Sequence, residues 1–290
     1  MNVNFTAPGQ VSAFLRERGI RPSKALGQNF LADRNVLDCI VREADLPPGA
    51  EVVEVGAGLG ALTAALLDCG ARVTAVEKDP ALQAVLEERF GAVPDFSLVR
   101  GDALAIDLAP LFAPPRRACL VSNLPYSVGT RVVVDAAACA SPPERMVLLL
   151  QREVCERFAA PPRSPARGAV SVWLQRLYDV RLARDVPPQC FVPRPEVMSS
   201  VIVLRRHRRF PLPPTEAEQF RELVRAGFLH RRKQLRVAMR GAGGLARPAD
   251  FAEQAFAAAA VPQNARAEEL SVEQWLALRD AWFPARRPLR

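Results

Sequence analysis

Residues 51–63 read EVVEVGAGLGALT and predict the first unit of a parallel α/β fold. The run Glu51 to Val55 is typical of a buried strand, and the segment from Ala61 to Cys69 is typical of a helix. Three glycines stand at the junction, and they are Gly56, Gly58 and Gly60. Glycine permits a tight turn and lets a ligand approach the backbone, so the stretch predicts a nucleotide-type pocket. The same stretch also satisfies the loose dinucleotide-binding pattern and leaves the cofactor class open.

The same alternation continues along the chain. Further strands are expected at 72–76, 96–99, 118–121 and 146–150, and helices at 80–90, at 131–140 and from 152 onward. This βαβα rhythm predicts a parallel sheet covered by helices on both faces, a Rossmann-like α/β fold. A helix at 170–178 is then followed by two strands, 180–186 and 200–204, which a proline-rich loop joins. We therefore expect an antiparallel pair at the edge of the sheet.

The last third of the chain has a different character. Residues 205–214 read RRHRRFPLPP, a polar, proline-rich break. We place a boundary here, with an α/β domain at 1–208 and an all-helical domain at 209–290. The expected helices of the second domain are 215–229, 231–240, 248–259 and 271–282. In the N-terminal extension, Asp33 is expected to cap a helix over 35–44.

The excess of positive over negative charge is confined to this last third. Residues 1–204 hold 22 Lys and Arg against 22 Asp and Glu, whereas residues 205–290 hold 17 against 9, so the whole net charge of +8 lies there. Such asymmetry indicates a polyanionic partner for the C-terminal domain.

Composition excludes several classes of protein. No run of about 18 uncharged apolar residues occurs, and the N-terminus lacks the layout of a signal peptide, so we expect a soluble cytoplasmic protein. The six cysteines form no Cys-x-x-Cys pair and only two histidines accompany them, so no metal site is expected. The cysteines are interpreted as buried free thiols.

Two acidic residues follow strands beyond the glycine turn. Glu77 ends the second strand, 21 residues after Gly56, where a carboxylate can hold ribose hydroxyls of either a nicotinamide cofactor or S-adenosylmethionine. Asp102 follows the third strand and can accept a hydrogen bond from an adenine amine, or else cap a turn.

A fourth strand is followed by SNLPY at 122–126. Asn-x-Pro is common in ordinary turns, and Tyr126 could pack as core. Its position behind the glycine turn, Glu77 and Asp102 instead favours a site for a planar substrate.

At this point a family resemblance is evident from the segments KALGQNFLAD, VEVGAGLGALT, EKD, GDAL, SNLPYSV, LLLQREVCERF, FVPRPEVMSS, HRRKQLR and RAEELS. Their order and spacing, from about residue 10 to 280, resemble the ribosomal RNA adenine N6,N6-dimethyltransferase family, and within it the bacterial KsgA-type small-subunit enzymes. The resemblance implies a class I methyltransferase sheet, S-adenosylmethionine as cofactor, small-subunit ribosomal RNA as partner, and a role in ribosome biogenesis. A Tyr-Gly pair common in the family is Arg167-Gly168 here, and that position is given no role.

The resemblance also implies roles for residues that match its motifs. Those expected at the cofactor are Asn29, Leu31, Gly56, Gly58, Glu77, Asp102 and Asn123. Those expected at the target base are Asn123, Leu124, Pro125, Tyr126 and Phe191.

The chemistry of an adenine N6 amine explains the residues of SNLPY. Its lone pair is delocalised into the ring, so acceptors on its hydrogens would draw the nitrogen toward tetrahedral geometry. The Asn123 side-chain oxygen and the Leu124 carbonyl can be these acceptors, while Pro125 fixes the backbone. Tyr126 and Phe191 are expected to stack on the two faces of a flipped base. An amide suits position 123 because its NH₂ group can bond elsewhere and hold the oxygen in place.

The basic segment HRRKQLR, 230–236, is expected to contact RNA phosphates through a helical turn that carries Arg231, Arg232, Lys233 and Arg236. The alternative interpretation is a solvated helix face.

Other functions are left open by the motifs. They are a large-subunit RNA methyltransferase of the macrolide-resistance type, a DNA adenine methyltransferase, a non-catalytic assembly or transcription factor on the same fold, and a nicotinamide-dependent oxidoreductase. No motif demands a dimer, so we expect a monomer.

Overall fold

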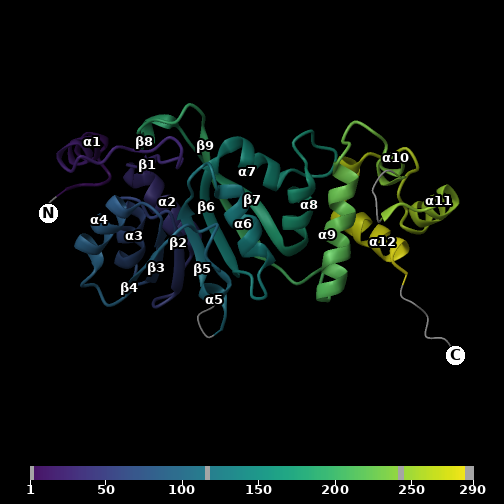
Figure 1. Cartoon of the computed structure of the whole chain (residues 1–290), viewed down its shortest axis with the longest axis horizontal. Coiled ribbons are helices and arrows are strands. Elements are labelled where there is room, and N and C mark those ends of the chain that lie inside the picture. The colour runs from purple at the N-terminus through teal and green to yellow at the C-terminus, as the bar shows by residue number, and fades with distance from the viewer. Residues whose placement is uncertain (1–2, 115–117, 241–244, 285–290) are drawn as a thin grey trace. The chain divides into compact units, whose positions relative to one another are not determined.

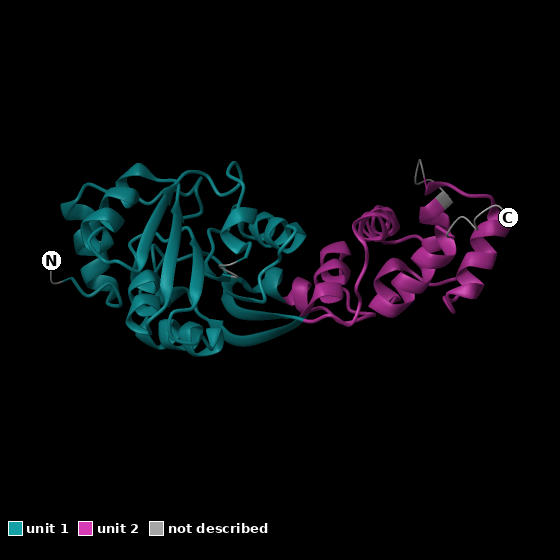
Figure 2. Cartoon of the chain, turned by 90° about the horizontal axis from the view of Figure 1, so that it is seen from below, with its two compact units in different colours: residues 1–155, 179–206 teal, residues 156–178, 207–290 magenta. Residues whose placement is uncertain are grey.

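The computed structural model describes residues 3–114, 118–240 and 245–284, which form two compact units (Figure 2). Unit 1 comprises the chain up to Cys155 together with Asp179–Arg206, and unit 2 comprises Glu156–Tyr178 and the chain from His207 onward. The break between Arg206 and His207 lies two residues before the boundary placed at 208. The segment 156–178 differs from the expectation, because its helix α8 (Ala169–Leu177) packs against α9 (Pro214–Phe228) in unit 2.

Unit 1 is built on a seven-stranded sheet with the order β4-β3-β2-β5-β6-β9-β7 (Figure 1). Strands β4, β3, β2, β5 and β6 pair in parallel, and β9 is antiparallel to β6. The predicted parallel sheet with two further strands at one edge is thereby confirmed. The strands span β2 Glu51–Val55, β3 Arg72–Glu77, β4 Phe96–Arg100, β5 Cys119–Asn123, β6 Arg145–Gln151, β7 Tyr178–Val186 and β9 Ser199–Arg206.

Helices cover both faces of this sheet. On one face, α2 (Arg34–Ala44) and α3 (Ala61–Asp68) share a buried apolar cluster with Leu149 of β6. The next residue, Leu150, points to the opposite face because side chains alternate along a strand. There α6 (Gly129–Ala138) begins at Gly129, where a Cβ atom would lie only 2.4 Å from Leu150 Cδ2. The layers therefore pack closely, and burial of these apolar side chains is the main force that holds them.

Local signals set several helix ends as expected. The Asp33 carboxylate accepts a hydrogen bond from the Val36 N–H at 3.0 Å and caps α2. Helix α4 (Pro80–Phe90) begins at Pro80, where the missing N–H costs nothing, and Asp79 caps it through the Ala81 N–H at 2.9 Å. A short α5 (Ala109–Phe112) and α7 (Arg152–Ala159) complete the helices around the sheet.

Two N-terminal features were not predicted. Helix α1 (Pro8–Glu17) buries Val11, Phe14 and Leu15, a spacing that is itself a helical signal. A second, two-stranded sheet pairs β1 (Phe30–Leu31) with β8 (Phe191–Val192) in antiparallel fashion, and the 3₁₀ turn η1 (Pro188–Cys190) precedes β8. Strand β8 lies within the segment that was interpreted as a proline-rich loop.

Unit 2 contains helices throughout its described part. After α8 and α9 come α10 (Leu235–Arg240), α11 (Ala249–Ala258), the 3₁₀ turn η3 (Ala267–Glu269) and α12 (Val272–Trp282). Its core is centred on Trp275, whose ring stacks on Phe228 with centroids 6.0 Å apart. Gly227 allows this contact, because a Cβ atom there would lie 2.5 Å from the Trp275 ring. The expected all-helical second domain is thus confirmed for the described residues.

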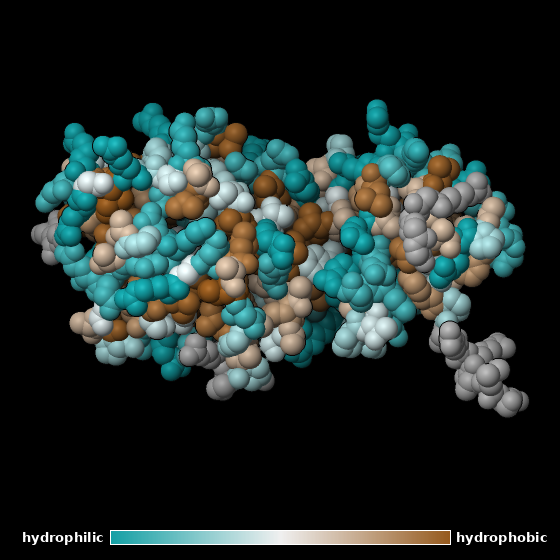
Figure 3. Space-filling model, in the orientation of Figure 1, coloured by the Kyte–Doolittle hydropathy of each residue, from teal (hydrophilic) through white to brown (hydrophobic). Residues whose placement is uncertain are grey.

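The remaining features of the fold are the molecular surface, the free cysteines, and the absence of membrane-spanning helices and metal-binding groups among the described residues. On the face seen in Figure 3 hydrophobic residues are scattered among hydrophilic ones. Of the six free cysteines, Cys69 is exposed, contrary to the expectation of buried thiols, because it ends α3 in a surface turn. No helix among the described residues is long and apolar enough to cross a membrane. The described residues also hold no group of three His, Cys, Asp or Glu side chains placed to bind a metal ion.

Candidate active site

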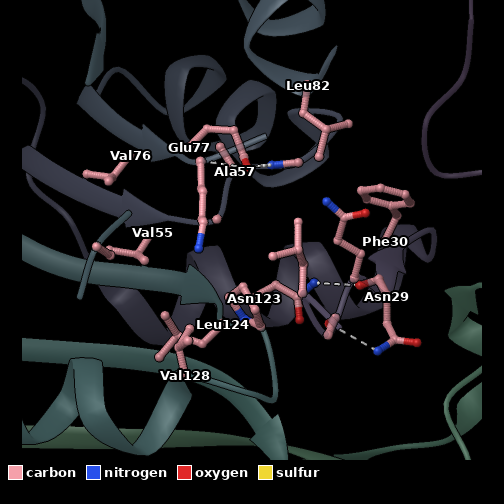
Figure 4. Close-up of a pocket in the computed structure, with 18 of the residues that line it drawn as sticks. Asn29, Phe30, Val55, Ala57, Val76, Glu77, Leu82, Asn123, Leu124 and Val128 are labelled. Atoms are coloured by element: carbon pink, nitrogen blue, oxygen red, sulfur yellow. Dashed lines mark hydrogen bonds between the residues drawn. The ribbon is translucent and has the colours of Figure 1, made fainter. Parts of the chain in front are cut away.

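A single large pocket of unit 1 gathers nearly all of the predicted cofactor and base residues (Figure 4). It opens at the carboxyl ends of β2, β3, β4 and β5, where ligands of open parallel sheets normally bind. Its walls come from four strand ends, namely 54–59, 76–78, 101–104 and 123–128, and from the N-terminal segment 25–31. Figure 4 shows Glu77 toward one end of this pocket and Asn123 with Leu124 toward another.

The glycine turn after β2 adopts left-handed backbone at each of its three glycines. Gly56, Gly58 and Gly60 have φ of 73°, 60° and 74°, which side chains with a Cβ adopt only at a cost. A Cβ atom on Gly56 would also lie 2.8 Å from Cδ and Cγ of Pro125. The turn therefore abuts the SNLPY segment directly, and glycine at position 56 is what allows this contact.

Glu77 is largely buried at the end of β3. Its Oε2 accepts the Gly58 N–H, and its Oε1 accepts the N–H groups of Lys78 and Asp79, each at 2.9 Å. Burial raises the pKa of Glu77 and these three hydrogen bonds oppose the rise. A carboxylate has about four acceptor sites, so about one is left for a ligand hydroxyl.

Asp102 lies across the same pocket, beyond β4. Lys78 Nζ donates to its Oδ2 at 2.7 Å and the Leu104 N–H donates to its Oδ1 at 2.9 Å. The Lys78 ammonium is the main cause of a lowered pKa, so Asp102 is an anion that can only accept hydrogen bonds. The turn-capping alternative is therefore also realised, because the same carboxylate caps its own loop.

Asn123 is the last residue of β5. Its Nδ2 donates to the Asn29 carbonyl at 3.1 Å, as the expectation that the NH₂ group bonds elsewhere requires. Its Oδ1 accepts no hydrogen bond from any residue that the structure describes. The strand is anchored just before it by the buried Ser122 hydroxyl, which donates to the Val55 carbonyl at 2.5 Å. The amide oxygen is thus held in one orientation and left available to a ligand.

The two expected stacking residues differ in position. Tyr126 lines the pocket, and its hydroxyl is hydrogen-bonded to the buried Ser199. Phe191 is not among the residues that line the pocket. It is 1% exposed, is the direct antiparallel partner of Leu31 in the β1–β8 sheet, and packs in the same core cluster as that residue.

The N-terminal segment 25–31 forms a wall of the pocket and is joined to the other walls by hydrogen bonds and close contacts. Gln28 Nε2 donates to Asp79 at 2.9 Å, and the Ser127 hydroxyl donates to the Leu26 carbonyl at 3.2 Å. Gly27 lies so close to the SNLPY segment that a Cβ atom on it would be 3.0 Å from the Ser127 nitrogen. Leu31 and Asn29 both line the pocket. These long-range ties were not predicted, because no local pattern announces them.

The basic residues of 231–236 lie in unit 2. The helix predicted to begin at residue 231 begins in the structure at Leu235. Arg231, Arg232 and Lys233 occupy an exposed turn, and only Arg236 belongs to α10. The Lys233 N–H bonds the His230 carbonyl, and the Leu235 N–H bonds the Ala265 carbonyl, which starts the helix at Leu235. Arg231 donates to the Pro165 carbonyl at 2.6 Å, and Arg236 faces Glu253 at 3.7 Å. Arg232 and Lys233 have no side-chain partner among the described residues.

Comparison with known proteins identifies the family. The model of a family described as ribosomal RNA adenine dimethylase matches residues 20–282. The chain belongs to this family. It is 44% identical over 280 residues to ribosomal RNA small subunit methyltransferase A of Anaeromyxobacter sp. (strain K), a match that covers 92% of this chain and 95% of that protein. It is 40% identical over 272 residues to the protein of the same name from Phenylobacterium zucineum (strain HLK1), with 94% and 92% covered.

Solved structures agree with this assignment of the rRNA dimethylase family. The 23S rRNA methyltransferase ErmE has a TM-score of 0.66 and 27% identity, over 87% of this chain and 99% of that one. A dimethyladenosine transferase from Plasmodium falciparum has a TM-score of 0.73 and 19% identity, over 85% and 94% of the two chains. The second comparison supports the fold alone. Together they confirm a Rossmann-like methyltransferase sheet with a helical C-terminal region.

A first prediction concerns Tyr126. If Tyr126 stacks on the target base, as the family resemblance implies, Tyr126→Ala removes an interaction worth about 1–3 kcal/mol, and kcat/KM for RNA is expected to fall about 10–100-fold. Tyr126→Phe keeps the ring and loses only the bond to Ser199, so a loss of less than about fivefold is expected, with about 1 kcal/mol lost in the free energy of unfolding. Steady-state kinetics on the RNA substrate checks both. Equal losses in the two variants would show that the hydroxyl, rather than the ring, is what matters.

Proposed function

We propose that this protein transfers two methyl groups from S-adenosylmethionine to the N6 amine of adenosines in small-subunit ribosomal RNA, as a step in small-subunit biogenesis. The observation that carries the proposal is Asn123. Its amide nitrogen donates to the Asn29 carbonyl, and its oxygen accepts no hydrogen bond from the described residues at the wall of a pocket that Glu77 and Asp102 also line. An oriented neutral acceptor is what an exocyclic amine requires.

The described residues fit S-adenosylmethionine. The left-handed glycine turn offers backbone in place of side chains, Glu77 retains an acceptor site for a ribose hydroxyl, and Asp102 is an acceptor-only anion for the adenine amine. Asn29 and Leu31, from the N-terminal segment, complete the wall. When bound, this cofactor supplies an activated methyl group.

The protein's own residues would act mainly by positioning. The Asn123 oxygen and the Leu124 carbonyl accept the two N6 hydrogens and localise the amine lone pair. The Leu124 N–H bonds the Leu149 carbonyl at 3.2 Å, and the Pro125 carbonyl accepts the Gly129 N–H at 2.9 Å, so the peptide carrying the second acceptor is fixed at both ends. Tyr126 stacks on the base. Holding both reactants in one geometry supplies much of the acceleration.

Phe191 enters this proposal only as support for the site. Its ring lies in the core below β1, and its partner Leu31 is a pocket residue. We propose that Phe191 fixes the position of Leu31 and does not form the second stacking face in the described arrangement.

The small-subunit substrate is preferred over the large-subunit alternative. The proteins named small subunit methyltransferase A are 40–44% identical to this chain, whereas the 23S rRNA methyltransferase ErmE is 27% identical. Membership of the rRNA dimethylase family also argues against a nicotinamide oxidoreductase and against a DNA methyltransferase.

The test is a mass-spectrometric assay of adenosines. Unmethylated small subunits, naked large-subunit RNA and single-stranded DNA are each incubated with the protein and S-adenosylmethionine. We expect N6,N6-dimethyladenosine in the small subunits alone. Methylation of large-subunit RNA would favour the macrolide-resistance type, and no methylated adenosine anywhere would leave a non-catalytic factor.

A second prediction concerns the exposed turn of unit 2. The double substitution Arg232→Ala/Lys233→Ala removes two cations that have no partner among the described residues, so small-subunit affinity is expected to fall about tenfold. The slope of log affinity against log salt concentration should decrease by about 1.5. Equilibrium binding at several salt concentrations checks both. Arg34→Ala/Arg42→Ala, which removes equal charge from exposed positions of α2, should change neither. If both double variants lowered the affinity equally, the effect would come from the net charge of the protein and not from the exposed turn.

A further inference from the structure

Glu54 is a pocket residue to which the proposed mechanism gives no task. It is the fourth residue of β2, two residues before the glycine turn begins, and it lines the pocket while remaining only 2% exposed. A carboxyl group buried to this degree is rare unless it is paired. Its surroundings therefore decide what it does.

Among the described residues, the neighbours of Glu54 supply one hydrogen bond to its side chain and no ion pair. The Thr63 hydroxyl of α3 donates to Glu54 Oε2 at 2.6 Å. From α4, Arg89 is the cation whose field reaches Glu54, but its guanidinium bonds the Leu59 carbonyl and lies 4.0 Å over the Phe5 ring. From β3, Glu77 contributes a like charge. Within the described part of the chain no Lys or Arg forms an ion pair with Glu54.

An unpaired carboxylate in such a place is costly, so the group stays neutral. Burial raises the pKa of Glu54 to about 8, and Glu77 adds to the rise. The Thr63 hydrogen bond and the Arg89 charge oppose it. Glu54 is therefore mostly protonated at pH 6.5 in the free protein and is half-ionised near pH 8.

We propose that Glu54 matches charge with the cofactor, being neutral in the free pocket and releasing its proton when a positively charged methyl donor enters. The inference rests on the proposed function, because S-adenosylmethionine brings a sulfonium and an ammonium group into a pocket that Glu54 lines. An opposite charge within about 4–6 Å lowers a carboxyl pKa by about 1–3 units, and because two positive charges enter the pocket we expect a shift of about 2–3 units. The atoms balance simply, since the carboxyl O–H bond breaks and the proton passes to solvent.

Binding of the donor is then linked to pH. Between about pH 6.5 and 8 binding then releases a proton from Glu54, so the Kd of S-adenosylmethionine is expected to rise about six- to eightfold when the pH falls from 7.5 to 6.5. A neutral adenosine thioether, 5′-methylthioadenosine, occupies the nucleoside part of the pocket without bringing a charge. Its binding should be independent of pH over the same range.

Proton release can be counted by isothermal titration calorimetry at pH 6.5 in buffers of different ionisation enthalpy. At this pH an α-amino group, whose ordinary pKa is about 7.7–8.0, stays protonated and adds little to the count. We expect about one proton released per S-adenosylmethionine bound and none per methylthioadenosine. Glu54→Gln, which mimics the neutral acid and can keep the bond from Thr63, should bind S-adenosylmethionine with no release and a flat pH profile.

The outcomes separate this inference from the proposed function. Release of less than about 0.3 proton by the wild-type protein, or the same release by Glu54→Gln, overturns the role of Glu54 even if methylation is normal. Equal release with methylthioadenosine also overturns it, because no positive charge has entered. If Glu54→Gln does not fold, the two wild-type titrations still decide. Failure of the proposed function would instead appear as absence of S-adenosylmethionine binding.

Discussion

Asn123→Ala is expected to lower the rate of methyl transfer at saturating substrates by about 10²–10³-fold. Removal of one preorganised hydrogen-bonding group from a transition state has effects of this size. The substitution takes away both the free Oδ1 acceptor and the Nδ2 bond to the Asn29 carbonyl at 3.1 Å. Affinity for the small subunit should stay within about twofold. Single-turnover methylation and equilibrium RNA binding are the two measurements.

Two further variants assign the loss to the amide. Asn123→Asp keeps the shape but faces the Asn29 carbonyl with an acceptor in place of a donor, so it should be nearly as inactive. Asn29→Ala removes a neighbouring amide side chain and keeps the backbone carbonyl that Asn123 uses. Its effect is expected on the Kd of S-adenosylmethionine, with less than a tenfold loss of rate. An Asn123→Ala protein that keeps more than a tenth of its rate would contradict the mechanism.

The sheet and its order of elements could be predicted because their signals are local. Mostly apolar runs such as Val52–Val55, followed by Gly56 and a helix over 61–68, indicate the strand, the turn and the helix that follows within a short window. Parallel strands then bring Glu77, Asp102 and Asn123 to one edge of the sheet, although they are far apart in sequence. The family resemblance named their roles, and the topology alone would have placed them together.

What could not be predicted depends on contacts between distant segments. Strand β8 has two residues and exists because Phe191 and Val192 pair with Leu31 and Phe30. Through that pairing Phe191 packs in the same core cluster as Leu31. Helix α10 begins at Leu235, rather than at 231, because the Leu235 N–H meets the Ala265 carbonyl thirty residues later. In the sequence Glu54 is one polar residue in a largely apolar strand. Only the structure shows that its side chain is buried beside the pocket.

Gly56→Ala is expected to lower the free energy of unfolding by about 2–5 kcal/mol and to abolish detectable methylation. About 1–2 kcal/mol comes from a Cβ at φ 73°. A further 1–3 kcal/mol comes from crowding against Pro125, whose ring carbons would lie 2.8 Å away. Activity is lost because Pro125 can move only by shifting the peptide of Leu124 and Asn123. Chemical denaturation and the methylation assay measure the two effects.

Gly49 and Pro125 separate backbone strain from crowding. Gly49 has φ 75°, nearly that of Gly56, yet a Cβ atom there would meet nothing within 4 Å. Gly49→Ala should therefore cost only the backbone term and leave methylation intact. Adding Pro125→Ala to Gly56→Ala removes the ring carbons that the new methyl group meets, so part of the stability should return. If Gly49→Ala were as damaging as Gly56→Ala, close approach between the glycine turn and the base-site segment would not be what requires glycine at position 56.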